Sequence, residues 1–324
     1  MASSEYILRL DPWAAEYEGA IQIGDGEEEA PRVDIRVESP AWAAVHPAAL
    51  PAPRRAAFVD GVRRVEHRLL IEHGERTIFG LLGSFGVGAV VVDGAARVAH
   101  ESTGRVAVAG GGLRLRRFET PVSNGRVAVA FDPVSEPENT PVAPVQGLQK
   151  AMRQGEAALA ERLSAEADLV FLDGPLTYLA AAARGPVVGF VKRLLRTYLD
   201  PSAAALLPRL GVGERTPLFL VEGARQPRYS WYTRIGAGRM IDSALTGVVR
   251  LEVPAAPGLE RARILADLAA RMLPRFASDP AHDPRAPQNL FPIGALEARL
   301  KHRLGDHGLI RRAIEARLHA EVMA

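Results

Sequence analysis

Two Asp-Gly pairs, each at the end of a strongly apolar run, constrain this chain most. Asp60-Gly61 closes the run AFVDG at residues 57–61, and Asp173-Gly174 closes LVFLDG at residues 169–174. Short apolar runs that end at a glycine predict buried strands, with each carboxylate at the last strand position. If these strands are neighbours, the two acids need a cation between them, or one must keep its proton. Such a pair is the basic plan of a divalent-metal nuclease site.

Each Asp-Gly pair also has a plainer interpretation. Asp-Gly is a common turn dipeptide, so either aspartate alone could simply cap a turn. Asp60 and Asp173 are 113 positions apart, and only the fold can bring them together. A structural α/β protein in which both pairs are mere turns would keep the two carboxylates far apart.

The composition narrows the class of protein and of metal site. A chain of 324 residues, 48% of them hydrophobic, can bury the core of one large α/β domain or of two domains. The formal net charge of +2 neither demands nor opposes a nucleic-acid partner. Without cysteine, any metal must be held by Asp, Glu, His or carbonyl groups. No signal-peptide pattern and no apolar run of about 18 residues is present, which predicts a cytoplasmic protein outside the membrane.

The order of apolar patterns predicts a mixed sheet flanked by helices. Residues 1–55 form an N-terminal extension, and residues 56–324 form the main domain with a strand-rich insertion at about 93–131. We expect strands at 105–109, 113–117, 126–131, 186–192, 216–222 and 245–253, a turn at Asn124-Gly125, helices at 146–166 and 193–206, and a mostly helical 254–322 broken by a Pro-rich loop at 279–292. The ribonuclease H-like fold is one such α/β arrangement, with acids on its first strand and on a later strand beside it.

A third carboxylate is expected from the helix before the second Asp-Gly strand. Glu156 shares a helical stripe with Met152, Leu159 and Leu163, whereas Glu161, five residues on, points to another face. Glu66 lies on the same extended run as Asp60, but roughly 20 Å away if the strand is straight. The plainer interpretation of Glu156 is a solvated helix glutamate.

Two basic side chains could assist phosphate chemistry. Lys192 ends the apolar run VVGFV, where it could neutralise a phosphate or simply reach solvent. It is one of three lysines in the chain, with Lys150 and Lys301. His302, in a helix with a leucine stripe, could approach a metal or a leaving phosphate, or stay solvated.

One segment interleaves aromatic and basic residues in the manner of a single-strand DNA contact. Its candidates for DNA binding are Arg225, Arg228, Tyr229, Trp231, Tyr232 and Arg234. Aromatic rings stack on unpaired bases and arginines hold phosphates. The alternative is an edge strand that packs its aromatics on the core.

In their order and spacing, these motifs resemble the NurA nucleases. The motifs are FVDG at 58–61, the helix with Arg153 and Glu156, FLDGPL at 171–176 and VGFVK at 188–192, and the resemblance spans about residues 56–305. It implies a ribonuclease H-like core, a homodimer and manganese-dependent cleavage of DNA, with Asp60, Glu156 and Asp173 as metal ligands for Mn²⁺ or Mg²⁺. It also implies a partner, the hexameric ATPase HerA, in DNA end resection and double-strand-break repair.

The chain departs from this family in one segment. Many members carry a tyrosine before a proline and a histidine seven residues after that proline; here Phe291 and Arg299 stand in those places. His302 lies three residues further on and could substitute if the helix is shifted. The sequence therefore predicts a metal-dependent exonuclease or endonuclease, or alternatively a non-catalytic DNA-binding adaptor on a motor ATPase.

Overall fold

The computed structural model describes residues 6–10, 31–122, 127–180, 183–192, 194, 198–223, 226–239, 241–279, 281–283 and 285–323. The strands are β1 (Ile7–Leu10), β2 (Arg32–Asp34), β3 (Ala56–His73), β4 (Arg76–Val92), β5 (Ala96–Ala109), β6 (Phe118–Val122), β7 (Val127–Ser135), β8 (Leu169–Asp173), β9 (Val187–Val191), β10 (Phe219–Glu222), β11 (Arg228–Arg234) and β12 (Val248–Pro254). The helices are α1 (Ala143–Leu163), α2 (Pro201–Ala204), α3 (Leu259–Met272), α4 (Phe291–Arg303) and α5 (His307–Met323), with 3₁₀ turns η1 (Leu207–Arg209) and η2 (Leu273–Arg275).

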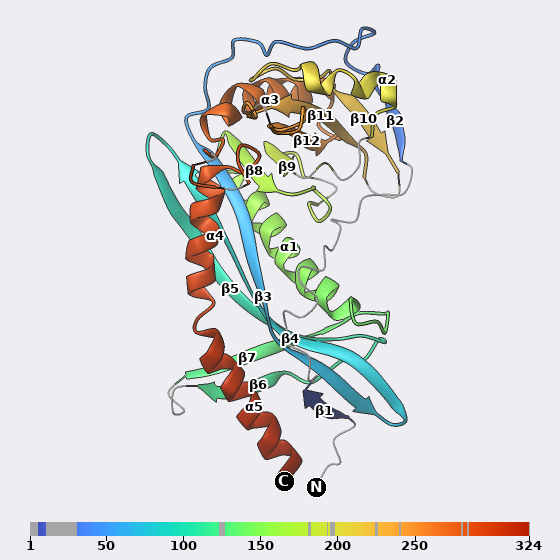
Figure 1. The fold of residues 1–324 in the computed structure, drawn as a ribbon, viewed down its shortest axis with the longest axis vertical. Helices are drawn as coiled ribbons and strands as arrows, with labels where there is room; N and C mark the ends of the chain where they lie inside the picture. The colour runs from blue at the N-terminus through green and yellow to red at the C-terminus, as the bar shows by residue number, and fades with distance from the viewer. Residues whose placement is uncertain are drawn as a thin grey trace.

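The strands form one mixed sheet in the order β2-β10-β11-β12-β9-β8-β3-β4-β5-β7-β6, with β1 paired to the far part of β3. At its centre, β5, β4 and β3 are antiparallel, and β3, β8 and β9 are parallel. The molecule is elongated (Figure 1): β8 to β12 and α3 gather at one end, and the long strands β3 to β5 lead to β1, β6, β7 and α5 at the other. The predicted mixed sheet flanked by helices is confirmed.

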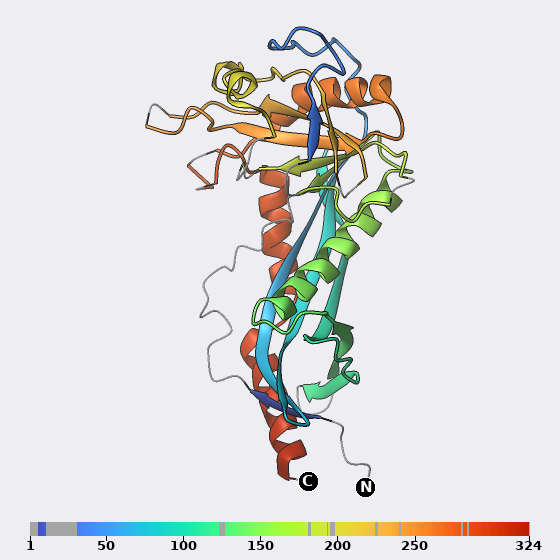
Figure 2. The ribbon, with the colours of Figure 1, turned by 90° about the vertical axis from the view of Figure 1, so that its right-hand side faces the viewer.

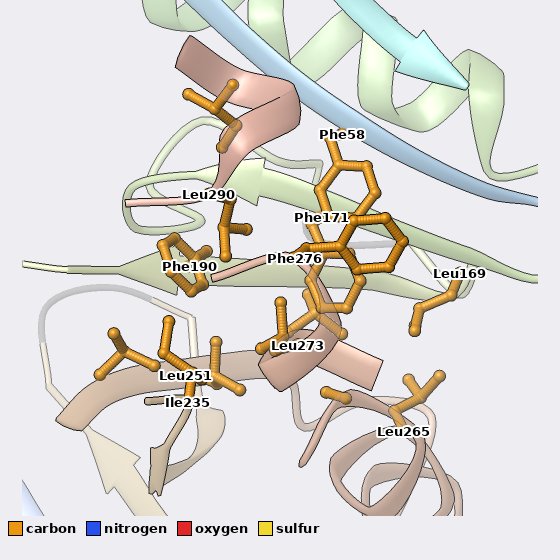
Figure 3. Close-up of a cluster of buried hydrophobic side chains, with 14 of the residues drawn as sticks. Phe58, Leu169, Phe171, Phe190, Ile235, Leu251, Leu265, Leu273, Phe276 and Leu290 are labelled. Atoms are coloured by element: carbon orange, nitrogen blue, oxygen red, sulfur yellow. The ribbon is translucent and has the colours of Figure 1, made fainter. Parts of the chain in front are cut away.

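Helices cover the two faces of the central strands (Figure 2). Along β3 the side chains alternate, so Ala57 and Val59 pack under α1, while Phe58 and Val62 face α4. On the α4 side the core is aromatic: Phe58 stacks on Phe171 with ring centroids 5.2 Å apart, and Phe276 lies against them (Figure 3). This alternation decides which face each candidate acid can occupy.

A glycine in β4 allows α4 to lie close to the sheet. Gly88 pairs with Asp60, and a Cβ built on Gly88 would lie 3.1 Å from Leu296 and 3.2 Å from Leu300 of α4. A side chain there would push the helix outward. The glycine-rich run at 77–92 is therefore a strand over which helices pack closely, and β4 has 17 residues.

Several predicted elements end elsewhere or lie outside the described residues. The predicted strand at 113–117 is wrong: in the described residues this segment joins no strand ladder, although Leu115 is buried in a hydrophobic cluster, and the strand begins at Phe118. The predicted helix at 193–206 is observed only at α2; Arg193 and residues 195–197 lie outside the described part. The predicted turn at Asn124-Gly125 also falls outside it, although β6 and β7 pair as expected of a hairpin.

Two described N-terminal segments, β1 and β2, join the sheet. β2 extends one edge by pairing with β10, and Trp42 packs against Phe219 with ring centroids 6.3 Å apart. In the part of the chain that is described, no helix is both long and apolar enough to span a bilayer.

Candidate active site

Asp60 and Asp173 occupy matching positions on neighbouring parallel strands. The β3–β8 register pairs Phe58 with Phe171 and Val59 with Leu172, so each acid follows directly after a paired residue. Adjacent strands are about 4.8 Å apart, and residues two positions on share a face, so both acids lie on the face of the stacked phenylalanines. The structure thus brings together two acids remote in sequence.

Both carboxylates are buried among other charges. Asp60 is 4% exposed and Asp173 is 7% exposed. Burial raises the pKa of Asp60 well above its usual value, and the negative charges of Asp173 and Glu156 raise it further. Oδ1 of Asp173 is buried without a hydrogen-bond donor in the described residues. Two carboxylates in this state favour a cation or a shared proton.

Lys192 supplies a positive charge to this pair. It follows the last residue of β9, on the same face as Val188 and Phe190, and its Nζ lies 2.7 Å from Oδ2 of Asp173. Burial alone would lower the pKa of Lys192, but the carboxylates of Asp173 and Asp60 outweigh it and raise that pKa. The ammonium therefore stays charged at neutral pH.

Glu156 reaches the cluster from the opposite face of the sheet. It is fully buried on α1, and its Oε2 accepts a hydrogen bond from Nη1 of Arg153 at 2.9 Å. Arg153 also donates to the backbone carbonyl of Asp173. A Cβ on Gly61 would lie only 2.5 Å from Oε1 of Glu156, so the glycine after Asp60 makes the space that this carboxylate enters.

The cluster can be tested for its fit to a divalent cation. In the described part of the chain, no three or more Asp, Glu, His or Cys side chains are already arranged to hold a metal ion. Instead, two of the acids form ion pairs with basic side chains: Asp173 pairs with Lys192, and Glu156 pairs with Arg153. Three features fit a Mn²⁺ or Mg²⁺ ion, which would take the place of those contacts. The side chains offer oxygen ligands, Oδ1 of Asp173 is buried without a hydrogen bond, and the pKa of Asp60 is raised.

Sequence reasoning missed a further acid, Glu297 of α4. Its negative charge contributes to the raised pKa of both Asp60 and Lys192, so it lies close enough to act on both groups. Its Oε1 accepts a hydrogen bond from Nη1 of Arg285 at 2.9 Å. Glu297 lies four residues after Ile293 and three before Leu300, both buried. Glu156 was predicted because it is an acid at helical spacing from apolar residues. The same pattern could have identified Glu297.

The other candidate residues lie on α4 and on the later part of β3. His302 is exposed in the last turn of α4, and Arg299 is exposed with its Nε 2.5 Å from Oε1 of Glu101. Phe291 packs on Phe276 with ring centroids 5.4 Å apart. Glu66 is buried further along β3, 2.8 Å from Nη2 of Arg64. A role for His302 stays a prediction.

The predicted DNA-binding segment needs a correction. Trp231 and Tyr232 are fully buried, because β11 lies between β10 and β12 and is covered on both faces. Tyr229 packs partly buried against the core. Arg225 lies outside the described residues.

The two described arginines of this segment are also engaged internally. Nε of Arg228 is 3.4 Å from Oε2 of Glu252, and Arg234 donates to the carbonyls of Leu210 at 2.6 Å and Ala244 at 2.9 Å. The structure therefore supports the alternative, in which this segment is a strand that packs its aromatic side chains into the core.

The chain was then compared with known proteins. The family model of the NurA domain matches residues 58–293. The chain belongs to the NurA family. This confirms the resemblance, and the matched range contains Asp60, Glu156, Asp173 and Lys192 of this NurA chain.

The crystal structure of the NurA nuclease from Sulfolobus solfataricus is among the solved structures that are similar to this NurA chain. The identity is 12%, the TM-score is 0.48, and the match covers 86% of this chain and 88% of that one. Among curated protein sequences, no significant match was found.

Proposed function

We propose that this NurA-family protein is a metal-dependent DNA nuclease, acting as an exonuclease or an endonuclease. The observation that carries the proposal is the register of β3 and β8, which sets Asp60 and Asp173 side by side on one face. Glu156 approaches them at Gly61, and Lys192 contacts Asp173. Acids gathered around a buried site, in a family of nucleases, suit metal-assisted hydrolysis of phosphodiesters.

The strand pairing supports a ribonuclease H-like core. Three antiparallel strands, β5, β4 and β3, are followed across the sheet by β8 and β9, which run parallel to β3. The acids lie on the first long strand of this unit and on the later strand beside it. That is the placement expected of the ribonuclease H-like arrangement.

We assign roles to the residues of the cluster on this basis. Asp60, Asp173 and Glu156 would hold Mn²⁺ or Mg²⁺, which when bound activates a water molecule and stabilises charge on the scissile phosphate. Lys192 presents a positive charge beside Asp173, where a phosphate would dock. Arg153 fixes Glu156 and the backbone at Asp173 with one guanidinium. Gly61 keeps the approach of Glu156 open.

Family membership also motivates the wider setting. We propose that the protein acts as a homodimer with a HerA-type hexameric ATPase, in DNA end resection and double-strand-break repair. The basic side chains of Lys301, His302 and Arg303, exposed in the last turn of α4, are a candidate path for the DNA backbone.

A cleavage assay tests the proposal. Linear DNA is incubated with Mn²⁺ and wild-type protein, Asp60→Ala, or the control Asp168→Asn. Asp168 directly precedes β8 and is exposed, and its carboxylate accepts hydrogen bonds from the amides of Arg54 and Arg55. We expect Asp60→Ala to lower the rate by at least about 100-fold and the control to leave it unchanged. Equal cleavage by Asp60→Ala and wild type would refute the assignment.

One observation favours the alternative of a non-catalytic DNA-binding adaptor. Two acids of the cluster already pair with cations of the protein itself, Asp173 with Lys192 and Glu156 with Arg153. Calorimetric titration with Mn²⁺ separates the two functions. A nuclease binds Mn²⁺ and loses that binding in Asp173→Ala, whereas an adaptor shows no binding that depends on Asp173.

A further inference from the structure

A buried asparagine, Asn289, is a second partner of the Lys192 ammonium beside Asp173. Nζ of Lys192 lies 2.7 Å from Oδ2 of Asp173 and donates to Oδ1 of Asn289 at 3.1 Å. Asn289 is fully buried in the loop just before α4. A lysine ammonium has three N–H donors on a flexible four-carbon stem. Two bonds to fixed partners determine where the third N–H points.

Asn289 is itself held in one orientation. Its Nδ2 donates to Oδ2 of Asp283 at 2.6 Å, so its Oδ1 is the atom left to face Lys192. Its backbone carbonyl accepts from the amide of Ser278 at 2.8 Å, and its own amide donates to the carbonyl of Arg285 at 3.2 Å. The side chain therefore cannot turn over without breaking bonds at both ends.

The same loop is fastened to the acid on α4. Nε of Arg285 is 3.2 Å from Oδ1 of Asp283, and its Nη1 donates to Oε1 of Glu297 at 2.9 Å. A continuous chain of hydrogen bonds thus leads from Asp173 through Lys192 and the loop to Glu297. Residues that orient a functional group in this way usually matter nearly as much as the group itself.

We propose that Asn289 is a positioning residue, which holds the Lys192 ammonium in place for a DNA phosphate at the acidic cluster. The inference rests on the proposed nuclease function for its purpose, but the holding of Lys192 is a property of the metal-free protein. Without Asn289, the ammonium keeps its attraction to Asp173 and loses its fixed direction.

The first test measures Lys192 without metal or DNA. The chain has three lysines, so acetic anhydride labelling followed by mass spectrometry reports Lys192 against Lys150 and Lys301 as internal references. We expect Asn289→Leu to raise the relative labelling rate of Lys192 about 5-fold. The matched control is Asn139→Leu, since Asn139 also bonds at both ends of its amide, to the backbone of Phe79 and Thr77, away from this loop. An unchanged rate in Asn289→Leu, or an equal rise in the control, overturns the proposal.

A second variant covers the case in which Asn289→Leu does not fold. The double exchange Asn289→Asp with Asp283→Asn keeps an acceptor facing Lys192 and a bond between positions 283 and 289. We expect this variant to label Lys192 no faster than wild type, because the carboxylate at position 289 also accepts a hydrogen bond from the ammonium and favours its charged form. Faster labelling of the exchanged variant contradicts the proposed geometry.

Cleavage kinetics form the second test. We expect Asn289→Leu to lower kcat about 10- to 100-fold. In a Lys192→Met background, the same substitution should lower kcat less than about 2-fold, because it acts through the lysine. If the factors by which the two substitutions lower kcat multiply in the double variant, Asn289 acts independently of Lys192, which contradicts the proposal. If wild type cuts no DNA while labelling responds as expected, the proposed function fails and the positioning of Lys192 stands.

Discussion

At the scale of single residues, the candidate site keeps an acid in a position that weakens the fold. Asp60 is buried beside Asp173 and within reach of the charge of Glu156. Lys192 offsets part of this repulsion. Functional sites commonly retain such groups at a cost in stability.

Asp60→Asn should therefore stabilise the metal-free protein at neutral pH. Because burial and Asp173 raise the folded-state pKa of Asp60, wild type binds this proton more tightly when folded. Its stability then falls as the pH rises from the unfolded-state pKa, about 4, through the raised folded-state pKa. We expect the variant to gain on the order of 1 kcal/mol at pH 7.5 and much less at pH 4.5, measured by urea unfolding. A variant less stable than wild type at pH 7.5 would contradict this.

Sequence could predict the acids but not all their neighbours. Asp60 and Asp173 each follow an apolar run that ends at a glycine, and Glu156 lies at helical spacing from apolar residues. Asn289 carried none, because a buried asparagine in a Pro-rich loop has no pattern that separates it from a turn residue. The aromatic residues of β11 suggested DNA binding, because composition alone does not reveal that β11 is an interior strand.

At the scale of elements, glycines set how closely α1 and the sheet approach. A Cβ at Gly61 would lie 2.5 Å from Oε1 of Glu156, 2.9 Å from Cγ of Met152 and 3.0 Å from the carbonyl of Gly86. Contacts this short force a neighbour to move, and the backbone of β4 cannot yield easily.

Gly61→Ala should thus cost about 1–3 kcal/mol of stability and displace Glu156, lowering nuclease activity. The matched control is Gly294→Ala in α4, where the nearest atom to an added Cβ is 3.7 Å away. Since alanine favours helix over glycine, we expect this control to gain about 0.5–1 kcal/mol. Chemical unfolding of both variants checks the pair, and a neutral Gly61→Ala would show that α1 adjusts freely.

Helix α5 is joined to β3 through a histidine that should respond to acid. His67 is buried at the irregularity of β3, with Nε2 3.1 Å from Oε1 of Glu315. Burial lowers the pKa of His67, the charge of Arg311 lowers it further, and Glu315 only partly opposes them. The folded state thus resists protonation, so stability is lost as the pH falls from about 6.5 through the lowered pKa.

We expect His67→Gln to flatten this loss of stability between pH 7.5 and pH 5. The exposed His319, also on α5, provides the control His319→Gln, which should follow wild type. Thermal unfolding across this pH range measures both. Parallel curves for wild type and His67→Gln would assign the acid sensitivity to other groups.

At the scale of the whole molecule, the residues before β3 contribute to the core that supports the site. Glu38 pairs with Arg215, which is 1% exposed, through oxygens 2.8 and 2.9 Å from its guanidinium nitrogens. Asp267 of α3 holds Nε of the same arginine at 2.7 Å. Three regions distant in sequence therefore meet at one buried cation.

Glu38→Gln should lower the free energy of unfolding by about 3 kcal/mol, because it removes the charge that offsets a buried arginine. The exposed pair of Arg32 and Glu222, 3.9 Å apart, supplies the control Arg32→Ala, with a cost below about 0.5 kcal/mol. Urea unfolding compares the two. A small effect of Glu38→Gln would show that this ion pair contributes little to the stability of the core.

The sequence predicted the order of elements better than their size. The strands at the Asp-Gly pairs and the helix before the second pair were placed closely, because their periods are strong. The length of β3, 18 residues, was not foreseen, since it continues beyond the glycine that marked its end. Its pairing with β4 and packing under α5 are tertiary contacts that overrode the local turn signal of Asp60-Gly61.

The continuity of β3 has a mechanical consequence. Asp60 is its fifth residue, so the strand continues for 13 more residues, about 40 Å, to the end of the molecule where β1 and α5 pack. A load applied at that distant end passes along one covalent backbone and its ladder of hydrogen bonds with β4 to the acids. A displacement of the far end of β3 would therefore reach Asp60 directly, and Asp173 through the pairing of β3 with β8.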